Sequence, residues 1–145
     1  MDENIYDKSN ILSIIRAMPE QIKESYNKNI RIKLKGRPSN IVICGMGGSS
    51  IAGQVLASYL DVPVFIGQNY GLPKHVDRNS LVLIVSYSGN TEESLSCYKA
   101  ARRNGYNTIA ISTGGKLLEH ARNEKIPYIE LPKGLQPRNA IAYLF

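Results

Sequence analysis

The chain has 145 residues, 43% of them hydrophobic and 21% charged, a composition typical of one globular domain with a hydrophobic core. The 18 lysines and arginines exceed the 12 aspartates and glutamates, and the net charge of +6 favours an anionic ligand. We expect no nucleic acid partner, because the densest basic stretch, residues 31–37, holds no aromatic side chain on which bases could stack.

Neither a membrane nor a metal is expected. No apolar stretch approaches the roughly 18 residues that span a bilayer, and the N-terminus lacks the basic start and apolar core of a signal peptide. We therefore predict a cytoplasmic protein. Cys44 and Cys97 are far apart in sequence without a C-x-x-C pattern, which favours two buried, reduced thiols. His75 and His120 have no second histidine at metal-ligand spacing.

Taken in chain order, the apolar residues predict first helices and then an alternation of strands and helices. Residues 8–28 show helical spacing interrupted by Pro19, so we expect one or two helices that cover the sheet, within a leading segment 1–39. In the domain 40–139, helical patterns fall near 50–60, 91–104 and 116–123. Apolar runs predict strands at 41–44, 62–66, 81–85, 108–111 and 126–131. This alternation predicts an α/β fold with a doubly wound, mostly parallel five-stranded sheet and helices on both faces.

A glycine-rich loop follows the first predicted strand. It contains Gly45, Gly47, Gly48, Ser49 and Ser50 in a G-x-G-x-x arrangement. The dinucleotide-binding fingerprint requires a further glycine or alanine where this chain has Ser50, and an acidic residue after the second strand, where 64–69 has none. A Walker lysine is also missing from the sequence. We therefore expect no nicotinamide, flavin or other cofactor.

A second loop, at the end of the 81–85 strand, has the composition of an anion site. Ser86, Ser88 and Thr91 can donate hydroxyl hydrogen bonds, and Gly89 lets the backbone approach closely. Unpaired N–H groups at the start of the following helix carry partial positive charge, which suits a monophosphate without a metal. The alternative is an ordinary helix cap, since serine, asparagine and threonine are common at that position.

At these loops the chain resembles the sugar isomerase (SIS) domain family, and within it the bifunctional phosphoglucose/phosphomannose isomerases. The resemblance rests on four motifs in the same order: Gly45 to Ser49, the SYSGNTEE run from Ser86 to Glu93, Ser112 to Lys116, and Gln136-Pro137-Arg138. It implies a flavodoxin-like three-layer sandwich. It also implies that a sugar phosphate is bound by Gly47, Gly48, Ser49, Ser86, Ser88 and Thr91.

The resemblance further implies a catalytic role for Arg138, as the cation near the reacting carbons. The alternative for Arg138 is a surface arginine in a linker. In the family the general base is a glutamate and the ring-opening group a histidine, both in a second domain that this chain does not contain. Glu92 and Glu93 lie near the anion loop, but acidic residues in a first helical turn commonly complement the helix dipole. Lys116 either touches substrate or begins a helix in solvent.

Two functions are therefore predicted. The chain is either the phosphosugar-binding half of an isomerase that converts glucose 6-phosphate or mannose 6-phosphate to fructose 6-phosphate, or a regulatory SIS module that binds a phosphosugar without turnover. We expect a homodimer or pairing with a second SIS domain. The tail, 140–145, is interpreted as the opening of that domain or as a frayed terminus.

Overall fold

The computed structural model describes residues 7–28, 30–34, 36–135 and 139–144. At its centre is a five-stranded sheet in the order β2-β1-β3-β4-β5, with every neighbouring pair parallel. The predicted α/β class and parallel sheet are confirmed. The strands are β1 (Ile41–Cys44), β2 (Val64–Gly67), β3 (Leu81–Val85), β4 (Asn107–Ser112) and β5 (Tyr128–Glu130).

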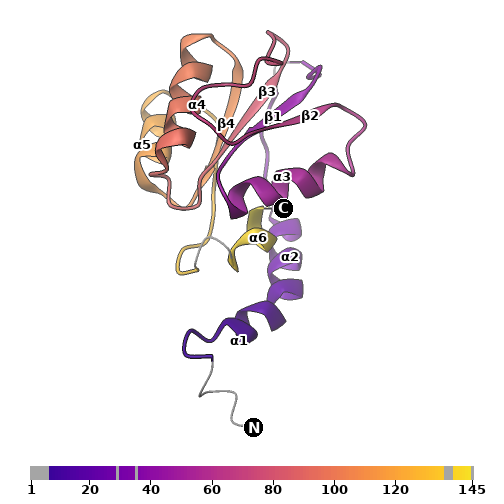
Figure 1. Cartoon of the computed structure of the whole chain (residues 1–145), viewed down its shortest axis with the longest axis vertical. Coiled ribbons are helices and arrows are strands. Elements are labelled where there is room, and N and C mark those ends of the chain that lie inside the picture. The colour runs from indigo at the N-terminus through magenta and orange to yellow at the C-terminus, as the bar shows by residue number, and fades with distance from the viewer. Residues whose placement is uncertain (1–6, 29, 35, 136–138, 145) are drawn as a thin grey trace.

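Both faces of the sheet carry helices, as predicted. Val42 and Cys44 of β1 belong to the core cluster that includes side chains of α4 (Glu92–Arg103) and α5 (Gly115–Asn123). Ile43 belongs to the opposite cluster, and Gly53 of α3 (Gly48–Ala57) packs directly against it. Successive residues of a strand face opposite sides of the sheet, so uninterrupted apolar strands support a layer on each side. Figure 1 shows the resulting three layers.

The leading segment forms two helices, as predicted. It forms α1 (Ile11–Arg16), which has no buried residue, and α2 (Met18–Asn27), with Pro19 in its first turn. A proline is tolerated there because the first N–H groups of a helix have no internal partner. The α2 helix packs on α6 (Ile141–Leu144), where the Tyr143 hydroxyl donates to Glu24 Oε2 at 2.7 Å. Within the described ranges, no helix is long and apolar enough to cross a membrane.

The two cysteines are buried, and the structure brings them into contact. Cys44 ends β1 and Cys97 lies in α4, and a hydrogen bond to Cys97, together with burial, raises the pKa of the Cys44 thiol. The Cys97 thiol in turn donates to the carbonyl oxygen of Gly71 at 2.8 Å. These thiols therefore join β1, α4 and the loop after β2 behind the carboxyl edge of the sheet.

Candidate functional site

The sheet order gathers the motif loops at one edge. Because β1 and β3 are neighbours and their connections leave in opposite directions, a topological switch point lies between their carboxyl ends. A Cβ on Gly45, just after β1, would lie 3.0 Å from the carbonyl oxygen of Val85 at the end of β3. The glycine-rich loop and the hydroxyl loop therefore lie side by side.

The loop after β3 is organised by Ser86. This side chain is only 2% exposed, and its Oγ lies 2.9 Å from Thr91 Oγ1. The same Oγ accepts a hydrogen bond from the Gly89 N–H at 3.1 Å. Ser88, in contrast, is exposed, and its Oγ accepts from the Asn90 N–H at 3.3 Å. Ser86 thus shapes the turn, while Ser88 and Thr91 are the hydroxyls nearer solvent.

The α4 helix begins without a side-chain cap. Thr91 is its N-cap residue, in an extended conformation, and makes no side-chain capping hydrogen bond. The simple cap that the sequence offered as an alternative is therefore not what Thr91 forms. The first N–H groups of α4 keep the partial positive charge of a helix start, which is the property an anion requires.

The loops after β3 and β4 are locked together at Gly89. Its φ is +70°, and a Cβ there would collide with the carbonyl oxygen of Gly114. The Gly89 carbonyl accepts from the Leu117 N–H at 2.9 Å, and Asn90 Oδ1 accepts from the Lys116 N–H at 3.1 Å. Glycine is required at position 89 because the two loop backbones touch.

The glycine-rich loop turns into α3 through Gly47, which has a φ of +53° and is exposed. Gly48 begins the helix, and Ser49 is buried at 5% exposure. Sequence reasoning missed the residues that brace this loop. Ser50 Oγ donates to the Gly47 carbonyl at 2.8 Å, and Gln68 Nε2 donates to Ser50 Oγ at 2.6 Å.

Tyr87 was also missed by the sequence reasoning. Its ring is buried, and its hydroxyl donates to the Pro132 carbonyl at 2.9 Å and accepts from the Leu135 N–H at 3.1 Å. Tyr87 thus ties the hydroxyl loop to the segment that leads toward Arg138. Arg138 itself lies outside the described residues. The sequence did contain a signal for this role. A large aromatic residue stands between two serines in a loop where anion binding does not require an aromatic side chain.

Three further residues near the loops differ in burial and in hydrogen bonding. Thr113 is buried, and its hydroxyl donates to the Tyr87 carbonyl at 2.8 Å. The Lys116 side chain is exposed at the start of α5. Glu92 accepts a hydrogen bond from the Tyr70 hydroxyl at 3.1 Å. No group of metal-ligating side chains occurs within the part of the chain that the structure describes.

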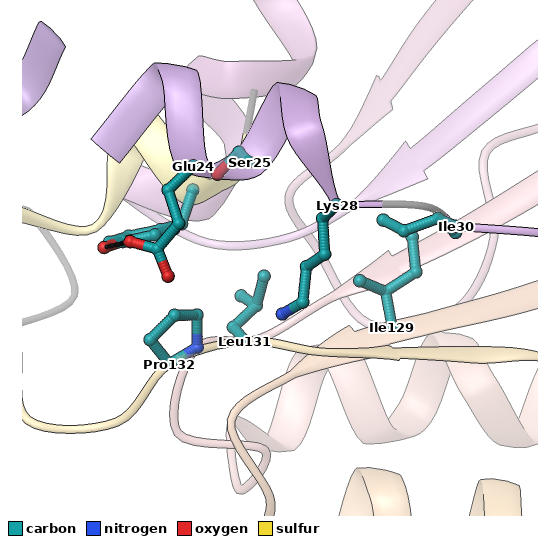
Figure 2. Close-up of a pocket in the computed structure, with 8 residues that line it drawn as sticks. Glu24, Ser25, Lys28, Ile30, Ile129, Leu131 and Pro132 are labelled. Atoms are coloured by element: carbon teal, nitrogen blue, oxygen red, sulfur yellow. Dashed lines mark hydrogen bonds between the residues drawn. The ribbon is translucent and has the colours of Figure 1, made fainter. Parts of the chain in front are cut away.

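A separate small cavity, of about 30 Å³, lies between α2, α6 and β5 rather than at the motif loops. Figure 2 shows Glu24, Ser25 and Lys28 of the α2 segment above Leu131 and Pro132. Lys28 Nζ donates to the Glu130 carbonyl at 3.0 Å, so the one cation there is already engaged. Leu131, Ile129 and Ile30 make the rest of the lining largely apolar. This cavity therefore belongs to helix packing and not to an anion site.

Comparison with known proteins identifies the family to which this fold and these loops belong. Residues 34–125 match the model of the SIS domain, and the chain belongs to that family. It is 44% identical over 135 residues to a bifunctional phosphoglucose/phosphomannose isomerase of Caldicellulosiruptor bescii. It is 47% identical over 110 residues to the protein of that name from Thermoplasma acidophilum.

The alignments differ in how much of each protein they cover. They include 88% and 75% of this chain but only 40% and 34% of those two relatives. The chain thus spans about two fifths of the length of the curated relatives it matches. Among solved structures, a protein of E. coli CFT073 matches 99% of this chain and 85% of its own, with a TM-score of 0.73 at 17% identity. At that identity the likeness supports the fold alone.

Proposed function

We propose that this chain is the phosphosugar-binding half of an aldose–ketose isomerase. Its substrates are glucose 6-phosphate or mannose 6-phosphate, which the complete enzyme interconverts with fructose 6-phosphate through an enediolate. The observation that carries the proposal is the uncapped start of α4, which lies beside the exposed Ser88, the half-buried Thr91 and the Gly45 loop. The similarity to curated phosphoglucose/phosphomannose isomerases supplies the reaction class.

The phosphate is held by a short set of groups. Thr91 and Ser88 donate hydroxyl hydrogen bonds, and the first N–H groups of α4 complete the cradle. Ser86 supports the phosphate indirectly, through Thr91. When its proton is given to Thr91 Oγ1, 2.9 Å away, the Thr91 proton is free for the phosphate. Gly47, Gly48 and Ser49 approach the sugar phosphate from the neighbouring loop.

Isomerisation needs more than this anchor. A base must move a proton between C1 and C2, a second group must open the ring, and positive charge must stabilise the enediolate. We assign the charge to Arg138 and place the base and ring-opening group outside this chain. Phosphate binding then fixes the reacting carbons in position, which lowers the activation free energy by roughly several kcal/mol. Such proteins act as homodimers or as paired SIS domains in this proposal.

The test separates binding from turnover. Calorimetry on the 145-residue chain should detect binding of the three hexose 6-phosphates, because the cradle is complete. A coupled assay on the same chain should detect no appreciable isomerisation, because the base is missing and half of the cleft is open to water, where charged groups are weakened.

Two results would contradict this division. Robust turnover by the isolated chain would bring Glu92, Glu93 and His75 forward as catalytic groups. Binding without turnover in a complete two-domain protein would favour the regulatory module instead. A chain with Thr91→Ala serves as the control for binding, since it should lose affinity while it keeps its fold.

A further inference from the structure

A cationic surface lies on the outer face of α4, and its lining includes none of Gly47, Ser88 and Thr91. It is a groove of about 540 Å³, within the range of small-molecule sites. Its floor is the side of α4 that carries Leu95, Lys99 and Arg103, and Lys116 of α5 lines it as well. The buried side of α4, with Cys97 and Tyr98 among its residues, faces the opposite way. The groove is therefore distinct from the space between the loops.

The positive charges in this groove have no partner in the described part of the chain. Lys99 and Arg103 are four residues apart on one helix, where like charges repel each other. Within the described residues, neither they nor Lys116 forms an ion pair or a side-chain hydrogen bond. Nearby arginines are paired: Arg102 with Glu124 at 2.9 Å, and Arg122 with Glu130 at 2.7 Å. The chain thus leaves cations unpaired here, where α4 and α5 could have supplied carboxylates.

The one carboxylate that lines the groove is already engaged. Glu92 Oε2 accepts from the Tyr70 hydroxyl at 3.1 Å, which holds it at the end of the groove near the start of α4. His120 lines the groove farther along α5. Three cations therefore face a single carboxylate that a hydrogen bond holds in place, and the balance favours an anion of more than one charge.

We propose that this groove binds a polyphosphate chain, either inorganic or that of a nucleoside di- or triphosphate, as a ligand separate from the phosphosugar. From Glu92 to Arg103 the helix rises about 16 Å at 1.5 Å per residue, a span that suits several linked phosphates rather than one. Leu95, Ala100 and the Tyr70 ring add apolar surface on which a base can lie.

The groove is also connected to the anion loop. The Lys116 N–H donates to Asn90 Oδ1 at 3.1 Å, and Glu92 opens the helix that follows Thr91. A ligand on Lys116 therefore contacts an element that shapes the phosphosugar loop. This proposal does not depend on the proposed function, because it concerns a different face of α4.

The experiment titrates tripolyphosphate and ATP into the 145-residue chain by calorimetry, at low and moderate salt. Saturable binding is expected, and Lys99→Gln with Arg103→Gln should weaken it about tenfold or more, because two charge-assisted contacts are lost. The matched control, Lys8→Gln with Lys74→Gln, removes the same charge from exposed lysines elsewhere and should leave the affinity unchanged. Ser88→Ala with Thr91→Ala should also leave it unchanged.

Three results would overturn the proposal: no saturable binding of either probe, equal weakening in the control variant, or loss of binding in the Ser88 and Thr91 variant only. The last result would place the polyphosphate in the phosphosugar loop. Comparison of the two probes identifies the source. If ATP binds more tightly than tripolyphosphate, and Tyr70→Ala removes that difference, the natural ligand is a nucleotide. If the two probes bind with equal affinity, it is inorganic polyphosphate.

Discussion

The hydroxyl oxygens of Ser86 and Thr91 lie 2.9 Å apart across the turn that joins β3 to α4. This contact links a buried residue to the first residue at the helix start. A serine hydroxyl has one proton and two lone pairs, so Ser86 can accept from the Gly89 N–H and still donate to Thr91. The sequence predicts that both hydroxyls contact the ligand, and in the structure the Ser86 hydroxyl also supports the loop.

Ser88 and Thr91 should each contribute directly to phosphosugar affinity. Thr91→Ala or Ser88→Ala is expected to weaken binding of glucose 6-phosphate by about 1–3 kcal/mol, the usual cost of a lost hydrogen bond to a charged group. Calorimetry provides the measurement. Ser58→Ala is the control, because Ser58 is exposed just after α3 and donates only to the Val55 carbonyl. Unchanged affinity in both site variants would remove these residues from the site.

Gly89→Ala should be far more damaging than Gly105→Ala. Both glycines have nearly the same φ, +70° and +71°, so alanine is strained at either position by about 1–2 kcal/mol. Only at Gly89 would the Cβ also meet the Gly114 carbonyl, whereas open space surrounds Gly105. We expect Gly89→Ala to cost at least about 3 kcal/mol of unfolding free energy in urea titrations. Equal losses in the two variants would refute the contact.

Tyr87→Phe should destabilise the chain by about 1–3 kcal/mol, because the half-buried Pro132 carbonyl and Leu135 N–H lose their shared partner. Thermal or urea unfolding measures the change. Tyr26→Phe is a matched control, since Tyr26 is 89% exposed. Hydrogen exchange should also quicken at Leu135 in the Tyr87 variant. Protection that stays unchanged there would show that Tyr87 does not hold this segment.

Tyr98 should make the fold sensitive to alkaline pH. Burial, and next the charge of Glu124, raises the pKa of Tyr98 from 10.0 to about 12. Between these values the unfolded chain loses a proton that the native chain keeps, so stability falls as the pH rises through this window. Among the described residues, none is placed to hydrogen-bond with the buried Tyr98 hydroxyl. Tyr98→Phe should therefore cost little at pH 7 and reduce the loss of stability between pH 10 and 12. A pH series of urea unfolding curves tests both points, and an unchanged alkaline loss would contradict the assignment.

Arg138 is a prediction from sequence alone, and its test needs a complete two-domain protein. Arg138→Lys should lower kcat with little change in KM, because a cation that meets the enediolate acts mainly in the transition state. Lysine keeps the charge but not the planar fork of donors. An effect on KM alone would instead place Arg138 on the phosphate.

The sequence by itself determined the α/β class, the strands and the edge at which the loops gather. The central strand β3, Leu81–Val85, is a short apolar run of the kind that is buried in a parallel sheet with a layer on each face. Parallel connectivity then brings the ends of β1, β3 and β4 to one edge, so Gly47, Ser88 and Thr91 could be grouped without coordinates. The leading helices were predicted from the sequence. The packing of α2 on α6 was not, because an amphipathic pattern shows which face of a helix is apolar but not which element that face contacts.

Only the tertiary structure decided which polar groups support the loops and which face solvent. Ser50 and Gln68 are 18 residues apart, and Tyr87 and Leu135 are 48 apart, yet both pairs are joined by hydrogen bonds. Such contacts depend on how α3, β2 and the C-terminal segment pack, and local sequence does not encode those distances. The same packing puts Cys44 against Cys97, and it gives Lys99 no carboxylate partner among the residues that the structure describes. Periodicity fixes the face on which a side chain lies, whereas its partner is set by the elements packed around it.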